Sequence, residues 1–209
     1  MTGHIAKGID RREFLSGAAL LALALGIPAA AVRLSQIADD DLPSPRQRLL
    51  AREVSQIVLP RTGTPGAGEV GVGDFLILAF AHGLEDSRAP VANPTDEPLR
   101  ADGSLDHLAW LERTLDRASG GDFLRLAPQK RAQVVAALDT TAFPPGPPPA
   151  DPSSWAKIKG LILTGYYTSQ TGAAQELRYE LVPGRFDNDI PLTPGYRAWS
   201  SDWTAVEFG

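Results

Sequence analysis

The chain has 209 residues, of which 43% are hydrophobic and 22% charged, and its net charge is −5. This acidic balance argues against nucleic-acid binding, because proteins that bind nucleic acids carry a basic surface that displaces counterions from phosphate. The absence of cysteine excludes disulfides, thiolate metal sites and cysteine catalysis. The 18 prolines and 20 glycines predict frequent breaks between regular elements.

The first 31 residues have the pattern of an export signal. Arg11 and Arg12 precede an uncharged stretch at 17–32, and residues 29–31 supply the small side chains that a signal peptidase accepts. The stretch is shorter than the roughly 20 apolar residues that a membrane-spanning helix needs. We therefore predict a signal segment, and a short membrane tether that stays uncleaved is an alternative.

The paired arginines favour one export route. Arg11 and Arg12 are followed two residues later by Phe14 and Leu15, which resembles the twin-arginine (Tat) signal. We predict that the export machinery recognises these four side chains and that the protein reaches the periplasm. A general secretory signal that contains Arg-Arg by chance is the alternative. The Tat route carries folded proteins, typically because a cofactor is inserted before export.

Apolar residues recur at helical spacing in five segments. These segments are residues 45–59, 72–84 and 104–120, a fourth that begins at Pro128, and a fifth at 152–169. Ser44 and Ser104 are candidate N-caps, and Pro128 suits the first turn of a helix. The second segment is apolar nearly all round, which predicts a central, buried helix. Because alternating strand patterns are almost missing, we predict an all-α bundle of about five helices.

The C-terminal region has a different composition, with no helical period. It carries six of the fifteen aromatic residues, namely Tyr179, Phe186, Tyr196, Trp199, Trp203 and Phe208. Disordered tails are poor in aromatic residues, so we expect this region to form an extended, irregular arm that packs on a protein surface. We favour the surface of a partner, and packing on the chain's own bundle is the alternative.

The sequence thus divides into four parts. After the signal, residues 32–44 are expected to form an acidic linker, residues 45–177 the helical domain and residues 178–209 the partner-binding arm. Asp39-Asp40-Asp41 in the linker is expected to be solvated, and a calcium site there is the less favoured alternative.

No convincing nucleophile–base pair is present. Residues 66–71 fit G-x-G-x-x-G, but a helical pattern precedes them where a dinucleotide site needs a strand, so we predict a glycine-rich loop between helices. His107 is expected to be exposed. His82 is expected to be a hydrogen-bonded helix residue. A stand-alone periplasmic enzyme that uses His82 and a nearby carboxylate is a disfavoured alternative.

Two blocks of sequence carry a family resemblance. The first is Gly-Tyr-Tyr-Thr-Ser-Gln-Thr-Gly at 165–172, followed by residues 176–179 and 182–184, and the second is the glycine–proline segment at 59–67, followed by residues 71–72. Both are similar to blocks of the gluconate 2-dehydrogenase subunit 3 family.

That resemblance implies the small, non-catalytic subunit of a periplasmic sugar or polyol dehydrogenase. In such complexes a large flavoprotein of the glucose–methanol–choline type holds FAD and oxidises the sugar, and a multihaem cytochrome c subunit often accepts the electrons. The small subunit binds the flavoprotein in the cytoplasm, supports its folding and carries it through the Tat pore. The chain itself is then expected to hold no cofactor or metal, and any membrane association comes through the complex.

Aromatic and arginine side chains dominate the binding energy of protein interfaces, which identifies candidate contacts at the end of the last helix and along the arm. These are Tyr166, Tyr167, Arg178, Tyr179, Phe186, Tyr196, Trp199 and Trp203. Gly165 and Gly172 are expected to permit close backbone approach. For Tyr166 and Tyr167, packing in the chain's own core is the alternative.

Overall fold

The computed structural model describes residue 37 and residues 41–91, 96–146, 153–179 and 189–200. Within these ranges it has five α-helices, which are α2 (Pro45–Val58), α3 (Val72–His82), α4 (His107–Ser119), α5 (Pro128–Ala142) and α6 (Ser154–Tyr167). The shorter elements are the 3₁₀ turns η4 (Leu84–Asp86) and η5 (Phe123–Arg125), the π-helical turn η6 (Gly172–Glu176), and the two-residue strands β1 (Arg178–Tyr179) and β2 (Trp199–Ser200). This architecture confirms the predicted all-α bundle.

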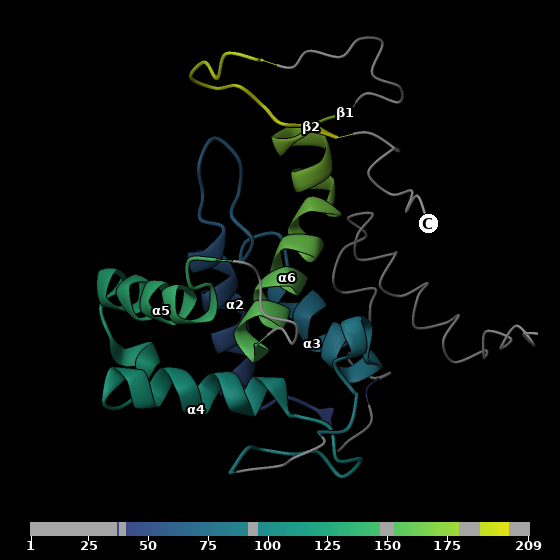
Figure 1. Ribbon diagram of the computed structural model, residues 1–209, viewed down its shortest axis with the longest axis vertical. Helices are drawn as coiled ribbons and strands as arrows, with labels where there is room; N and C mark the ends of the chain where they lie inside the picture. The colour runs from purple at the N-terminus through teal and green to yellow at the C-terminus, as the bar shows by residue number, and fades with distance from the viewer. Residues whose placement is uncertain (1–36, 38–40, 92–95, 147–152, 180–188, 201–209) are drawn as a thin grey trace, which may run out of the picture.

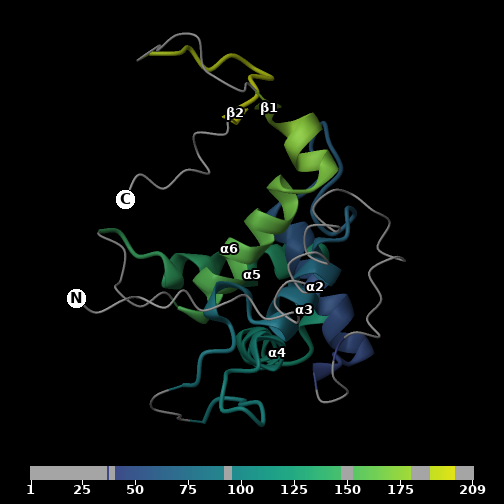
Figure 2. The ribbon, with the colours of Figure 1, turned by 90° about the vertical axis from the view of Figure 1, so that its right-hand side faces the viewer.

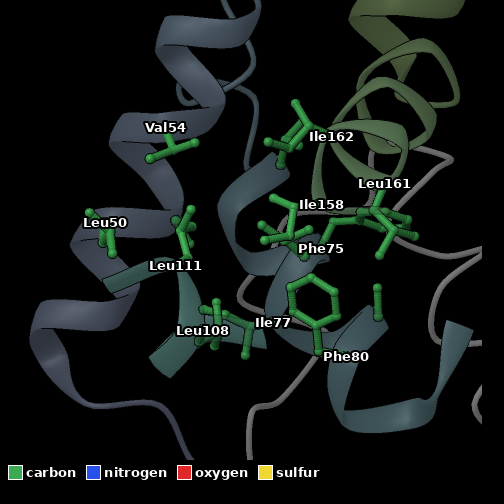
Figure 3. Close-up of a cluster of buried hydrophobic side chains, with 14 of the residues drawn as sticks. Leu50, Val54, Phe75, Ile77, Phe80, Leu108, Leu111, Ile158, Leu161 and Ile162 are labelled. Carbon is green, nitrogen blue, oxygen red and sulfur yellow. The ribbon is translucent and has the colours of Figure 1, made fainter. Parts of the chain in front are cut away.

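The helix α3 lies at the centre of the bundle, as its apolar sequence predicts. It packs between α2 and α6, and α4 and α5 pack in turn against α2, α6 and each other (Figure 1). Every residue from Phe75 to Phe80 is buried. Side chains of α2, α4 and α6 meet this stretch in one hydrophobic cluster (Figure 3). The residues labelled there are Leu50, Val54, Phe75, Ile77, Phe80, Leu108, Leu111, Ile158, Leu161 and Ile162.

Local sequence signals set the helix ends. Ser44 caps α2 as predicted, because its hydroxyl accepts from the Gln47 N–H at 3.1 Å and the Gln47 side chain accepts from the Ser44 N–H at 2.9 Å. Pro128 occupies the first turn of α5, also as predicted. The prediction for Ser104 was wrong. The N-cap of α4 is Asp106, which accepts from two N–H groups of the first turn at 3.0 and 3.1 Å.

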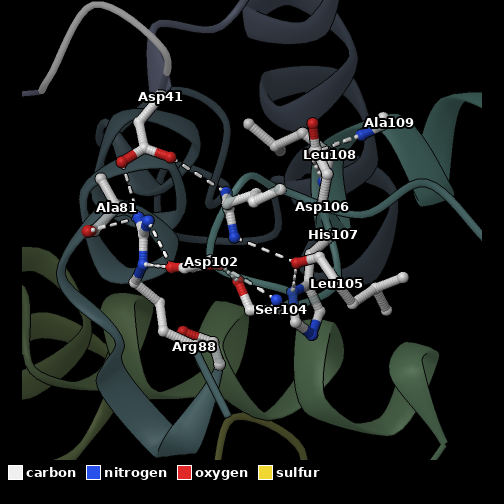
Figure 4. A network of polar contacts seen from close by, with 12 residues as sticks. Asp41, Ala81, Arg88, Asp102, Ser104, Leu105, Asp106, His107, Leu108 and Ala109 are labelled. Atoms are coloured by element: carbon white, nitrogen blue, oxygen red, sulfur yellow. Dashed lines mark hydrogen bonds and ion pairs between the residues drawn. The ribbon is translucent and has the colours of Figure 1, made fainter. Parts of the chain in front are cut away.

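A polar network joins the segment before α2 to the connection between α3 and α4 (Figure 4). Asp41 accepts from Arg88 at 2.6 Å and from Arg100 at 3.1 Å, and Arg88 also pairs with Asp102 at 2.7 Å. Two hydrogen bonds from Ser104, together with Arg88, lower the pKa of Asp102 to about 2. The expected solvation of Asp41 was therefore wrong, because two arginines surround it; Asp39 and Asp40 lie outside the described residues.

His107 is buried, which corrects the expectation of an exposed side chain. It stacks on Phe80 with ring centroids 4.7 Å apart, and its Nδ1 lies 3.0 Å from the Leu105 carbonyl oxygen. The ring lies in the first turn of α4, four residues before the buried Leu111, and therefore on the helical face that packs into the core. Burial, with contributions from nearby positive charges, lowers the pKa of His107 from 6.5 to about 4.

We predict that this histidine makes the stability of the fold depend on pH. The unfolded chain binds the proton more readily between pH 6.5 and 4, so the contribution of neutral His107 is complete above pH 6.5 and is lost as the pH falls. The loss between pH 7 and pH 5 is expected to be about 2 kcal/mol. Urea unfolding of the wild type and of His107→Phe at both pH values measures it. An equal loss in the variant would contradict the prediction.

Candidate partner interface

The buried end of α6 is tied to two other parts of the chain. Tyr166 is only 3% exposed, and its hydroxyl donates to the Pro65 carbonyl at 3.0 Å and lies 3.2 Å from the Thr64 hydroxyl. Thr64 in turn donates to the Glu176 carboxylate at 2.5 Å. We call these four residues the clasp. It joins the loop after α2, the end of α6 and the turn η6, and thereby unites both sequence blocks that carry the family resemblance.

The clasp corrects the expected role of one tyrosine. The Tyr166 side chain belongs to the chain's own core, so core packing, the alternative for this residue, is what the structure has. Tyr167 differs, because it is 36% exposed and packs edge-on against Tyr166 with ring centroids 5.3 Å apart. Of the two tyrosines, Tyr167 is therefore the one with a surface that another protein can contact.

Both candidate glycines permit close approach, but to their own chain. A Cβ on Gly165 would lie 2.5 Å from the Phe75 ring, which shows that this glycine lets α6 pack closely on α3. A Cβ on Gly172 would lie 2.1 Å from the Tyr166 carbonyl oxygen. Gly172 therefore allows the turn η6 to fold back on the last turn of α6.

A second set of contacts fixes the base of the arm. We call the residues that make these contacts, 172–179 and 196–200, the arm root. The strands β1 and β2 pair in parallel, and the Arg178 N–H donates to the Ala198 carbonyl at 2.8 Å. The Arg178 guanidinium lies 4.1 Å from the centre of the Trp199 ring, a distance at which cation and ring attract. The Trp199 indole N–H donates to the Tyr196 hydroxyl at 2.7 Å. The structure thus brings three of the predicted contact residues together.

Arg197 completes the arm root, although the sequence analysis did not identify it. Its guanidinium donates to the carbonyls of Ala174 at 2.9 Å, Glu176 at 3.3 Å and Leu177. A cation at this position satisfies carbonyls that the end of a helix leaves without partners. The three carbonyls lie some twenty residues earlier in the chain, so no local spacing could have indicated the contact.

The described part of the arm projects from the bundle. It extends beyond the C-terminal end of α6, away from α2–α5, in both views (Figures 1 and 2). Ile190 is 40% exposed, Leu192 85% and Trp199 41%. In the described part of the arm these three side chains therefore keep a large share of their surface accessible. Phe186 and Trp203, the Tyr179 side chain, and the signal residues Arg11, Arg12, Phe14 and Leu15 lie outside what the structure describes.

The other candidate sites have structural explanations. The loop at 66–71 lies between α2 and α3, as predicted, and Glu69 stabilises it by accepting from the Gly66 N–H at 2.8 Å and from Arg61. A groove of about 530 Å³ between α4 and α5 has no histidine or carboxylate in its lining, so His82 does not contribute to it.

Among the described residues, no group of three or more His, Asp or Glu side chains could hold a metal ion. No helix in the same part of the chain is long and apolar enough to cross a membrane.

The described part of the chain is thus an all-α bundle. Its most prominent surface feature is the arm, which is held at the arm root and exposes apolar side chains. A family model described as Gluconate 2-dehydrogenase subunit 3 matches residues 45–184. The chain belongs to that family, whose members are subunits of a multisubunit dehydrogenase complex, and this implies a catalytic partner. Neither a curated protein nor a solved structure matches the chain.

Proposed function

We propose that the chain is the non-catalytic small subunit of an FAD-dependent sugar or polyol dehydrogenase and that its arm binds the flavin-containing catalytic subunit. The observation that carries the proposal is the arm itself, which is fixed at its root and exposes Ile190, Leu192 and Trp199. Membership of the family supports a catalytic partner. In this proposal FAD belongs to the partner, and a multihaem cytochrome c subunit is a second partner that accepts the electrons.

The chemistry of the arm root explains why the contact would be mainly apolar. Arg178 and Arg197 are engaged by the Trp199 ring and by backbone carbonyls of the same chain, so their charges are already partnered. The apolar and aromatic surface of Ile190, Leu192 and Trp199 is then what a partner can bury, and its burial contributes about 25 cal/mol per Å². A stable interface buries about 800 Å² on each partner, so we expect Tyr167 at the end of α6 to share in it.

Folding support and export complete the proposal. The small subunit binds the catalytic subunit in the cytoplasm, and its twin-arginine signal carries the folded pair to the periplasm, where any membrane association comes through the complex. This division of labour accounts for an apparent Tat signal on a chain whose sequence offers no cofactor site.

Purification tests the proposed function directly. The tagged full-length chain, recovered from its native host, is expected to bring a flavoprotein that oxidises a sugar or polyol, identified by mass and flavin absorbance. The chain purified alone is expected to show neither flavin absorbance nor sugar oxidation. Turnover by the isolated chain would contradict the proposal and would favour the stand-alone enzyme that uses His82.

Replacing the arginine pair tests the export step. We predict that Arg11→Lys combined with Arg12→Lys leaves the catalytic subunit in the cytoplasm, because the Tat machinery recognises the pair and not merely its charge. Cell fractionation followed by the dehydrogenase assay measures the distribution. Arg33→Lys, the same change outside the pair, is the matched control and should leave export intact. Normal periplasmic activity in the double variant would show that this signal does not carry the partner.

A further inference from the structure

The outer segment of the arm, residues 189–195, has features that point to a specific mode of contact. We infer that it inserts as an extended peptide into an apolar groove of the catalytic subunit, with Leu192 as the central contact. The inference rests on the proposed function, because it specifies how the arm binds the partner proposed there.

The backbone of the outer segment is constrained before it meets a partner. Pro191 and Pro194 fix their own φ angles and disfavour helical conformations for the residues that precede them. The Tyr196 N–H donates to the Thr193 carbonyl at 2.9 Å, and Gly195 has a φ of +79°. This closes a turn of type II, in which proline is common at the first central position and a positive φ is needed at the second. A preformed extended peptide loses little conformational entropy on binding, which is why proline-rich segments serve as ligands.

The side chains of the outer segment suit an apolar groove. In an extended chain, residues two positions apart point to the same side, so Ile190 and Leu192 form a pair separated by Pro191. Leu192 is the most exposed of the large apolar residues in the described part of the chain, at 85%. Together with Trp199 at the arm root, this pair gives the arm apolar surface that a partner can cover.

The peptide groups of the outer segment suit the same mode of contact. No backbone hydrogen bond joins the N–H groups of Ile190 and Leu192 to another described residue, and in an extended chain both point to the same edge. Pro191 has no N–H to offer at the opposite edge. One edge of the segment can therefore donate to backbone carbonyls that border the groove, as in peptides that add a strand to a partner.

The position of the outer segment in the sequence suggests a role in partner choice. The match to the family ends at residue 184, whereas the clasp lies inside the matched range. The outer segment therefore lies beyond the matched range, and so do Arg197 and Trp199 of the arm root. We expect the groove to select Leu192 by its shape and apolar lining.

Photo-crosslinking in the native host tests the inference. The full chain carries the photoreactive amino acid p-benzoylphenylalanine in place of Leu192 or, as a control, of Leu49, which is also exposed but lies on α2. We expect the probe at position 192 to form an adduct with the flavoprotein, located by peptide mapping, and the probe at position 49 to form none.

An affinity measurement with the purified complex provides the second test. Leu192→Asp is expected to raise the Kd for the catalytic subunit about tenfold to a hundredfold, whereas Leu49→Asp should change it less than threefold. A flavoprotein that co-purifies but neither crosslinks at 192 nor loses affinity in Leu192→Asp would overturn the inference and leave the proposed function standing. An adduct between two copies of the chain would also overturn it. Failure of any flavoprotein to co-purify with the wild type would overturn both.

Discussion

Replacing Gly172 with alanine is expected to lower recovery of the catalytic subunit at least tenfold while the helical bundle keeps its stability. The added Cβ would lie 2.1 Å from the Tyr166 carbonyl oxygen and 2.9 Å from the Tyr167 Cα. Both are backbone atoms of α6, so the turn η6 must move instead. Moving it displaces Glu176 from the clasp and the carbonyls that Arg197 holds. The arm then loses the fixed root from which it projects.

Two measurements separate the arm from the bundle in this experiment. Flavin recovered per tagged chain reports the complex, and thermal unfolding followed by circular dichroism reports the helices. Gly160→Ala is the matched control, because a Cβ at that position of α6 meets nothing within 4 Å and alanine favours the helix by about 1 kcal/mol. Full recovery of the flavoprotein with Gly172→Ala would show that the root does not position the arm.

Trp155→Ala is expected to have the largest effect on the bundle itself, a loss of about 3–5 kcal/mol. The Trp155 side chain is the largest among those that are fully buried in the described residues. Its indole N–H donates to the Asp139 carboxylate at 2.8 Å, and Lys159 pairs with the same carboxylate at 2.7 Å. The substitution therefore leaves a cavity between α5 and α6 and removes one partner of Asp139.

Urea unfolding measures this loss, and two variants divide it into its causes. Trp155→Phe keeps much of the volume but not the hydrogen bond, so its loss should be about 1–2 kcal/mol. Trp199→Ala, at an exposed tryptophan of the arm, should change the stability of the bundle by less than 1 kcal/mol. A loss below 1 kcal/mol for Trp155→Ala would show that the α5–α6 contact does not hold the bundle together.

The helices could be predicted because their signals are local. Apolar spacing places α2 and α3 within a few residues of their observed bounds, and Ser44 and Pro128 mark two helix starts correctly. Where two capping residues compete, local chemistry does not decide. Ser104 and Asp106 are both good N-caps, and Ser104 instead donates to Asp102, so the N-cap lies two residues later than predicted.

The contacts of the candidate interface could be predicted only in part. The aromatic content of the arm indicated its importance, and Arg178, Tyr196 and Trp199 do come together. The clasp joins Pro65 to Tyr166 across about a hundred residues of sequence, and neither residue type by itself implies such a partner. A buried tyrosine and an exposed one have the same sequence signature, so the roles of two adjacent tyrosines required the three-dimensional structure.

The network around Asp41 fixes the start of the described helical domain. Ile37 is buried, and Asp41 is held at the connection between α3 and α4, at the opposite end of the molecule from the arm (Figure 1). In the proposed function, the described domain begins at one end of the bundle and the partner binds at the other, so the length of the bundle separates the two. The bundle would then act as a spacer, so that a translocase can engage one end without colliding with the folded enzyme carried at the other.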